Sequence, residues 1–167
     1  MRLPEVTRRV FLSRSLVVLG AAAAPACTPG PGAEAPPGLR VLSAGQWQVL
    51  AAAADAFIPR GGAFPVGAAD LDLARRVDAY LAQNDPALAS GLAGALLLLE
   101  WLGGPLAGRL GRFSRMDAAG RAAVLEALPR SFGLPRRVHG GLKQVCTFLF
   151  YAQPESWQGI GYDGPWV

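Results

Sequence analysis

The chain has 167 residues, of which 51% are hydrophobic and 17% charged, and its formal net charge is +4 at pH 7. Four arginines and one glutamate fall within residues 1–26, so the charge of the remainder drops from +4 to +1. The later arginines form isolated pairs, Arg75-Arg76 and Arg136-Arg137, which are typical of solvated helix faces. We therefore expect no nucleic-acid partner, and the residues after 26 suffice for one domain with one core.

Residues 1–26 have the organisation of an export signal. Basic residues precede a short, weakly apolar run at 16–24, and a small-x-small cleavage pattern (APA) ends the segment. The run is too short for a permanent membrane span, which takes about 20 apolar residues. The sequence RRVFL marks the twin-arginine subtype, which a translocase reads and which is not an anchor. The residues of this signal are Arg8, Arg9, Phe11 and Leu12.

Cys27 directly follows the cleavage pattern, and two interpretations stay open. In a bacterial lipoprotein such a cysteine is acylated, and the Pro- and Gly-rich linker 27–38 would tether the domain. Ala24 in place of the usual leucine, with Pro25 beside it, agrees equally with ordinary cleavage that leaves Cys27 unmodified. A single acyl chain also holds weakly without a second membrane signal.

Residues 39–167 predict an all-α domain of about five to six helices. Ser43 and Gln46 have the spacing of a capping box, and Pro59 ends the helix that follows. A second helix is expected over 69–83. Its apolar positions, Leu73, Val77, Tyr80 and Leu81, should point inward, and its charged positions, Asp70, Asp72, Arg75, Arg76 and Asp78, mostly outward.

Residues 87–102 are apolar nearly all round and follow a start signal, Asp85-Pro86. Polar residues and glycines interrupt the run, so we expect a buried core helix and not a membrane span. The sequence GGP at 103–105 should end it. A weak helix to about Phe113, a capped helix over 117–128 and a long helix over 134–151 are expected next. No alternating run of strand length is present.

Residues that carry chemistry are sparse. His139 is the only histidine, the two cysteines lie far apart, and no group of carboxylates has metal-ligand spacing. We expect a structural role for His139, no catalytic or metal site, and no cofactor held by this chain itself. The glycines at 91 and 94 and at 103 and 104 are expected to allow close helix packing, because no strand precedes them as in a nucleotide-binding loop.

The last twenty residues contain six aromatic residues. After Gln153, Gly and Pro are too frequent for a helix, so an extended aromatic tail is expected. Such a tail either covers the domain's own helices or anchors a partner, since Trp and Tyr are over-represented at binding hot spots. The candidates for partner binding are Phe150, Tyr151, Trp157, Ile160, Tyr162 and Trp166.

Several stretches, in order and spacing, resemble one family over nearly the whole chain. It is the subunit 3 (gamma) family, the small subunit of gluconate 2-dehydrogenase and of other membrane-associated flavin-dependent sugar dehydrogenase complexes. Residues 103–137 resemble it least. The resemblance rests on the twin-arginine signal and on the sequences LS at 42–43, DAFIP at 55–59, FPVGA at 64–68, VDAYL at 77–81, FYAQP at 150–154, Trp157, IGY at 160–162 and GPW at 164–166.

The resemblance implies a non-catalytic accessory subunit. In that family the catalytic subunit is a glucose-methanol-choline-type flavoprotein that binds FAD and lacks its own export signal, and a cytochrome c subunit often links it to the respiratory membrane. The small subunit holds no cofactor; its signal would export the folded, FAD-loaded partner and its helical body would stabilise it. The location implied is the periplasm, with membrane association through the complex or a lipid on Cys27.

Cys146 then has three alternatives in an oxidising compartment: a buried free thiol, a disulfide with Cys27, or a disulfide with the partner subunit. Its helical spacing with Leu142 and Leu149 favours the buried thiol. A second function also stays open, namely a free-standing periplasmic helical lipoprotein or interaction domain. That alternative predicts an aromatic tail packed fully on the chain itself.

Overall fold

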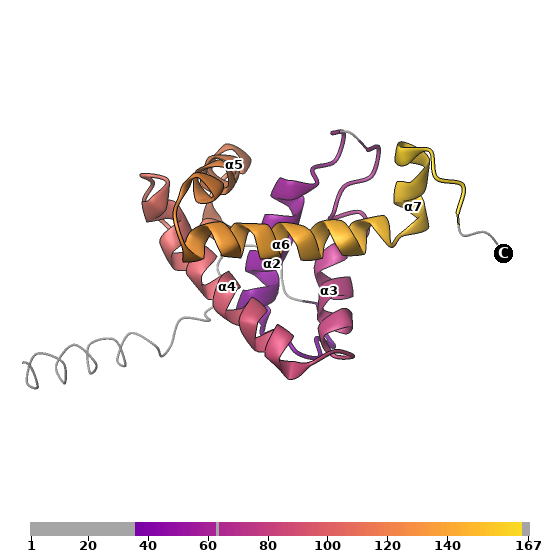
Figure 1. Cartoon of the computed structure of the whole chain (residues 1–167), viewed down its shortest axis with the longest axis horizontal. Coiled ribbons are helices and arrows are strands. Elements are labelled where there is room, and N and C mark those ends of the chain that lie inside the picture. The colour runs from indigo at the N-terminus through magenta and orange to yellow at the C-terminus, as the bar shows by residue number, and fades with distance from the viewer. Residues whose placement is uncertain (1–35, 63, 165–167) are drawn as a thin grey trace, which may run out of the picture.

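Helix α2 spans Ala44–Phe57 (Figure 1). It begins with the capping box that the sequence predicts. The Ser43 hydroxyl accepts a hydrogen bond from the Gln46 N–H, and the Gln46 side chain accepts one from the Ser43 N–H at 2.8 Å. The box supplies partners for backbone donors that a helix start otherwise leaves unsatisfied. The helix ends just before Pro59, because proline removes a backbone donor and clashes with a preceding turn.

The structure, a computed structural model, describes residues 36–62 and 64–164. Within them the chain forms a single compact domain of six α-helices without strands, which confirms the predicted fold class. The twin-arginine residues, Cys27, most of the linker and Trp166 lie outside the described residues, so the predictions for them stay predictions.

The remaining helices follow in chain order. The predicted helices over 117–128 and 134–151 are confirmed, and the one over 69–83 is shorter than predicted, because residues 69–72 form turns and Asp72 has a φ of 45°. The helices are α3 Leu73–Leu81, α4 Pro86–Leu106, α5 Ala118–Ala127, α6 Leu134–Tyr151 and α7 Pro154–Trp157, with three short 3-10 helices, η1 Phe113–Arg115, η2 Leu128–Arg130 and η3 Gln158–Ile160.

Helix α4 runs through Gly103 and Gly104, where the sequence predicted its end. A Cβ on Gly103 would lie 3.0 Å from a methyl group of Val124, so the missing side chain allows α5 to approach α4 closely. The expected weak helix after it is absent. Positive φ angles at Gly108 and Gly111 are incompatible with a continuous helix before Phe113. Gly91 and Gly94, by contrast, face open space and mediate no close packing.

The stretch after Gln153 also differs from the prediction. One turn of α-helix, α7, starts at Pro154, and η3 follows it directly. Proline is tolerated at the first position of a helix because that N–H needs no intrahelical partner. The tail therefore folds into compact turns up to Gly161, whose positive φ of 66° ends them.

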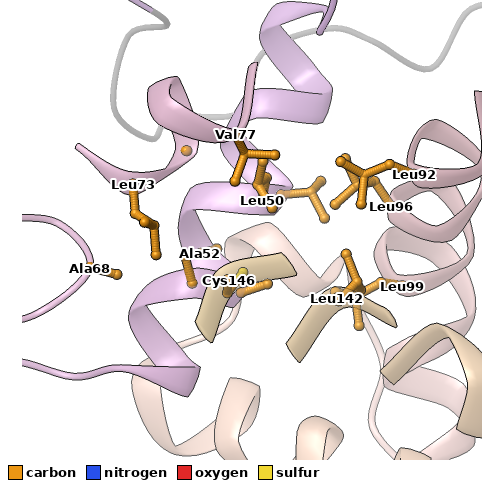
Figure 2. Close-up of a cluster of buried hydrophobic side chains, with 14 of the residues drawn as sticks. Leu50, Ala52, Ala68, Leu73, Val77, Leu92, Leu96, Leu99, Leu142 and Cys146 are labelled. Atoms are coloured by element: carbon orange, nitrogen blue, oxygen red, sulfur yellow. The ribbon is translucent and has the colours of Figure 1, made fainter. Parts of the chain in front are cut away.

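Helix α2, and not α4, is the central helix of the domain. It contacts α3, α4, α5 and α6, and α6 crosses in front of it in Figure 1. Figure 2 shows Leu50 of α2 near Val77, Leu92 and Leu96, and Leu142 of α6 beside Leu99 of α4. The row of alanines in α2 is mostly buried, and such small side chains allow several helices to approach one axis.

Helix α4 is therefore not the fully buried helix that its composition predicts. Leu92, Leu96 and Leu99 face the core, but Leu97 keeps 60% of its surface exposed. Among the described residues, α4 is the one helix long and apolar enough to cross a membrane by length and composition, a test that core helices of soluble proteins also pass. The other exposed apolar residues of α4 are Leu88, Trp101, Leu102 and Leu106.

Asp78 is the largest departure from the predicted helix faces. It was expected on the solvated side of its helix, yet it is only 2% exposed. Its carboxylate accepts hydrogen bonds from the N–H groups of Arg40, Val41 and Leu42 at 2.7 to 2.9 Å. A helical pattern cannot reveal this role, because the three donors lie more than 35 residues earlier in the chain.

Candidate functional site

The end of the molecule built by α6, α7 and η3 carries exposed aromatic and apolar side chains. We call this surface the aromatic end; it consists of Phe148, Tyr151, Trp157, Ile160 and Tyr162. Four of these residues, all but Trp157, keep between 42% and 57% of their surface exposed. Figure 1 places α7 at one end of the long helix α6, away from the start of that helix.

Phe150 does not belong to this surface, although it was predicted as a partner contact. It is only 1% exposed and belongs to the hydrophobic core. Its ring meets the ring of Phe64 edge to face at 5.1 Å, and Phe64 in turn meets Tyr151 at 5.8 Å. Phe150 thus supports the aromatic end from beneath and is not available to a partner in this conformation.

Phe64 also supports the aromatic end, a role that the sequence pattern did not indicate. It lies in the loop between α2 and α3 and connects to the C-terminal turns, because a Cβ on Gly159 would overlap the Phe64 ring. Glycine is therefore required at 159 for this contact. No local sequence signal indicates a contact between residues 95 positions apart, so only the fold could show it.

Trp157 lies between the two parts of the aromatic end. Its indole N–H donates to the Tyr151 carbonyl at 2.9 Å, and its ring meets Tyr162 edge to face at 5.2 Å. The Tyr162 N–H donates to the Trp157 carbonyl at 3.0 Å. Gly164, with a φ of 109°, lies against the Trp157 ring, where a Cβ would come within 3.2 Å. The tail therefore packs partly on itself and holds Tyr162 in a defined position.

The chemistry of the aromatic end is that of a contact surface. Trp157 already uses its N–H within the chain, and the exposed rings of Phe148, Tyr151 and Tyr162 offer apolar area with few polar groups. Such rigid aromatic side chains lose little conformational entropy on binding and are typical anchors of protein interfaces.

His139 and Cys146 both lie on α6. The His139 ring meets Phe57 edge to face at 5.4 Å, and burial together with nearby Lys143 lowers its pKa, which agrees with a structural role. Cys146 is a free thiol with no exposed surface, and burial raises its pKa to about 12. A disulfide from Cys146 to another chain would require the covering side chains to move.

A hollow of about 430 Å³ lies between α2, the start of α3 and the segment around η1. Its lining includes Trp47, Asp55, Arg115 and Arg121. The Trp47 indole N–H is buried and has no hydrogen-bond partner. The indole nitrogen is not exposed, so a ligand in the hollow could not accept a hydrogen bond from it. Within residues 36–62 and 64–164, no group of three or more His, Cys, Asp or Glu residues could hold a metal ion.

Comparisons of the chain with protein-family models, curated proteins and solved structures find no match.

Proposed function

We propose that this chain is a non-catalytic accessory subunit of an FAD-dependent dehydrogenase of the glucose-methanol-choline type. In this proposal it stabilises the catalytic subunit and carries it, already folded and loaded with FAD, through the twin-arginine translocase. The complex acts in the periplasm at the membrane, where a cytochrome c subunit can accept its electrons.

The aromatic end is the observation that carries this proposal. Phe148, Tyr151, Ile160 and Tyr162 remain about half exposed after the chain has packed its own core. At the same time, Phe64 and Trp157 hold the surrounding turns in place. An ordered apolar surface of this kind is typical of a subunit whose partner completes the burial.

The alternative of a free-standing lipoprotein has less support. It predicts that the tail packs fully on the chain, whereas Ile160 and Tyr162 remain exposed. The twin-arginine pattern favours the accessory subunit as well, because this route carries folded proteins and a small helical chain gains little from it unless a cofactor-loaded partner travels with it.

The proposal is tested by purifying the chain from its own host in mild detergent, with a small C-terminal tag, and recording the visible absorption spectrum. We expect flavin bands and a larger co-purifying chain. Replacing Ile160 and Tyr162 together by serine should remove both. Leu97→Ser is the matched control, because Leu97 is an exposed apolar residue on α4, outside the aromatic end.

Export is tested separately with Arg8→Lys and Arg9→Lys. We expect the dehydrogenase activity of the envelope to disappear together with this chain. A colourless chain that purifies alone, or a dehydrogenase that is still exported in the double-lysine variant, would contradict the proposal.

A further inference from the structure

The end of the molecule opposite the aromatic end carries two of its most exposed apolar side chains. Leu110, between α4 and η1, is 98% exposed, and Phe132, between η2 and α6, is 94% exposed. Positive φ angles at Gly111 and Gly133 form the tight loops that hold these side chains away from the core. Leu134, which begins α6, adds a third exposed apolar residue beside Phe132.

Both loops come from the same end of the fold. Helix α4 leads into the first loop and α6 starts from the second, and the two helices contact each other. Helix α5 contacts α4 and η2, and η2 contacts α6. Figure 1 shows the end of α4 and the start of α6 at the side away from α7. We call segments 105–115 and 128–137 the basic loops.

The basic loops carry positive charge, and no acidic residue lies within them. They contain six arginines and no Asp or Glu. The rest of the described residues contains six basic and ten acidic residues, so its net charge is −4 while that of the basic loops is +6. The basic loops therefore carry an excess of positive charge within the described residues, and the Glu100 carboxylate, which accepts hydrogen bonds from the Ser114 N–H and hydroxyl, offsets only part of it. The six residues are Arg109, Arg112, Arg115, Arg130, Arg136 and Arg137.

The guanidinium groups of the basic loops are free to meet external anions. Within the described residues, the ion pairs join Arg60 to Asp70 and Arg75 to Asp72, and neither involves a basic loop. Arg112 stacks over the Trp101 ring at 4.3 Å, which leaves its charge near the surface beside an exposed aromatic side chain.

We propose that the basic loops dock onto an anionic phospholipid bilayer, with Leu110 and Phe132 inserted among the acyl chains and the arginines on the phosphate groups. Two side chains that project singly from separate loops suit a fluid surface, which adapts to their shape, whereas a protein partner would need a pocket for each. The acidic remainder of the domain is repelled by the same surface and so orients the molecule. This inference is independent of the proposed dehydrogenase partner and leaves the aromatic end free to bind it.

Site-resolved fluorescence tests this inference on the full chain. In a Cys27→Ser background, Leu110→Cys, Phe132→Cys and the matched control Ile160→Cys each receive an environment-sensitive fluorophore; Cys146 stays unlabelled because it is buried. With vesicles of phosphatidylcholine containing phosphatidylglycerol, we expect a blue shift at residues 110 and 132 and none at 160. Pure phosphatidylcholine vesicles and high salt should abolish the shift, because both remove the electrostatic attraction.

A second measurement uses vesicle sedimentation with Arg109→Gln combined with Arg137→Gln. Each arginine near an anionic surface adds substantial attraction, so the partition coefficient should fall about tenfold or more. Arg75→Gln, an exposed arginine outside the basic loops, should leave it nearly unchanged. Equal fluorophore shifts at 132 and 160, or no shift with phosphatidylglycerol, would overturn the proposal. A shift at 132 produced by the co-purifying dehydrogenase and not by vesicles would assign this end to a protein interface and would overturn it as well.

Discussion

The carboxylate of Asp78 on α3 accepts a hydrogen bond of 2.7 Å from the backbone N–H of Leu42, just ahead of α2. The N–H groups of Arg40 and Val41 donate to the same side chain. One buried carboxylate thereby anchors the segment through which the N-terminal part of the chain enters the domain. The linker therefore leaves the folded body from a defined point beside α3.

Asp78→Asn should destabilise the domain markedly. Asparagine keeps the shape but loses the charge, and its amide group presents donors to a site that contains only donors. Hydrogen bonds to charged groups contribute about 1.5–3 kcal/mol each, so we expect the free energy of unfolding to fall by about 2–4 kcal/mol. Urea denaturation followed by circular dichroism measures this. Asp163→Asn, an exposed carboxylate, is the control and should change stability by less than about 0.5 kcal/mol.

The same carboxylate predicts how stability depends on pH. Burial by itself raises the pKa of Asp78, but the hydrogen bonds from Leu42, Arg40 and Val41 outweigh this and lower its pKa below the ordinary value. A group whose pKa is lowered on folding stabilises the folded state above its ordinary pKa. This contribution should therefore be present at neutral pH and lost as the pH falls below about 4, where a free Asp becomes protonated.

This prediction is tested by measuring the free energy of unfolding of the wild type and of Asp78→Asn from neutral pH to the acid limit. We expect the difference between the two proteins to shrink as the pH falls through the acid range, because only the wild type loses the charge. A difference that stays constant down to the acid limit would show that it comes from the amide donors that Asn introduces and not from the charge of Asp78.

Gly159→Ala and Gly140→Ala should change stability in opposite directions. A Cβ at 159 would overlap the Phe64 ring, so that ring must move and the aromatic end loosens, at a cost of about 1–3 kcal/mol. Gly140 lies inside α6 with open space beside it, and alanine there should stabilise the helix by about 0.5–1 kcal/mol. Thermal unfolding of both variants provides the comparison. Equal effects of the two substitutions would mean that Phe64 does not pack against the C-terminal turns.

Cys146 should be unreactive in the native chain. Burial raises its pKa to about 12, so almost no thiolate is present at neutral pH, and the thiol has no exposed surface. A Cys27→Ser variant should therefore show no reaction with a disulfide-exchange reagent until a denaturant is added, after which one thiol reacts. Rapid modification in native buffer would show that α6 opens readily and would revive the disulfide to a partner chain.

The sequence alone located the five longer helices, α2 to α6, because capping residues and helical periodicity are local signals. It missed the single turn of α7 and predicted a weak helix before Phe113 that is absent. Ser43 with Gln46, and Asp117, each predicted a helix start that the structure contains. The pattern also located the aromatic end, since a concentration of Trp, Tyr and Phe in a short segment is visible in composition. What the pattern assigned incorrectly were faces and ends, such as the outward position of Asp78 and the end of α4 before Gly103.

Only the tertiary structure decided which surfaces are buried and which charges lie together. Asp78 is buried because backbone donors from residues 40–42 surround it, and α4 exposes Leu97 because α2 occupies the centre. The two basic loops are 13 positions apart in the sequence, from residue 115 to residue 128. They come together only in the fold, where the end of α4 lies near the start of α6. Contacts between distant segments carry no local signal, since their energy comes from packing that exists only after the chain has folded.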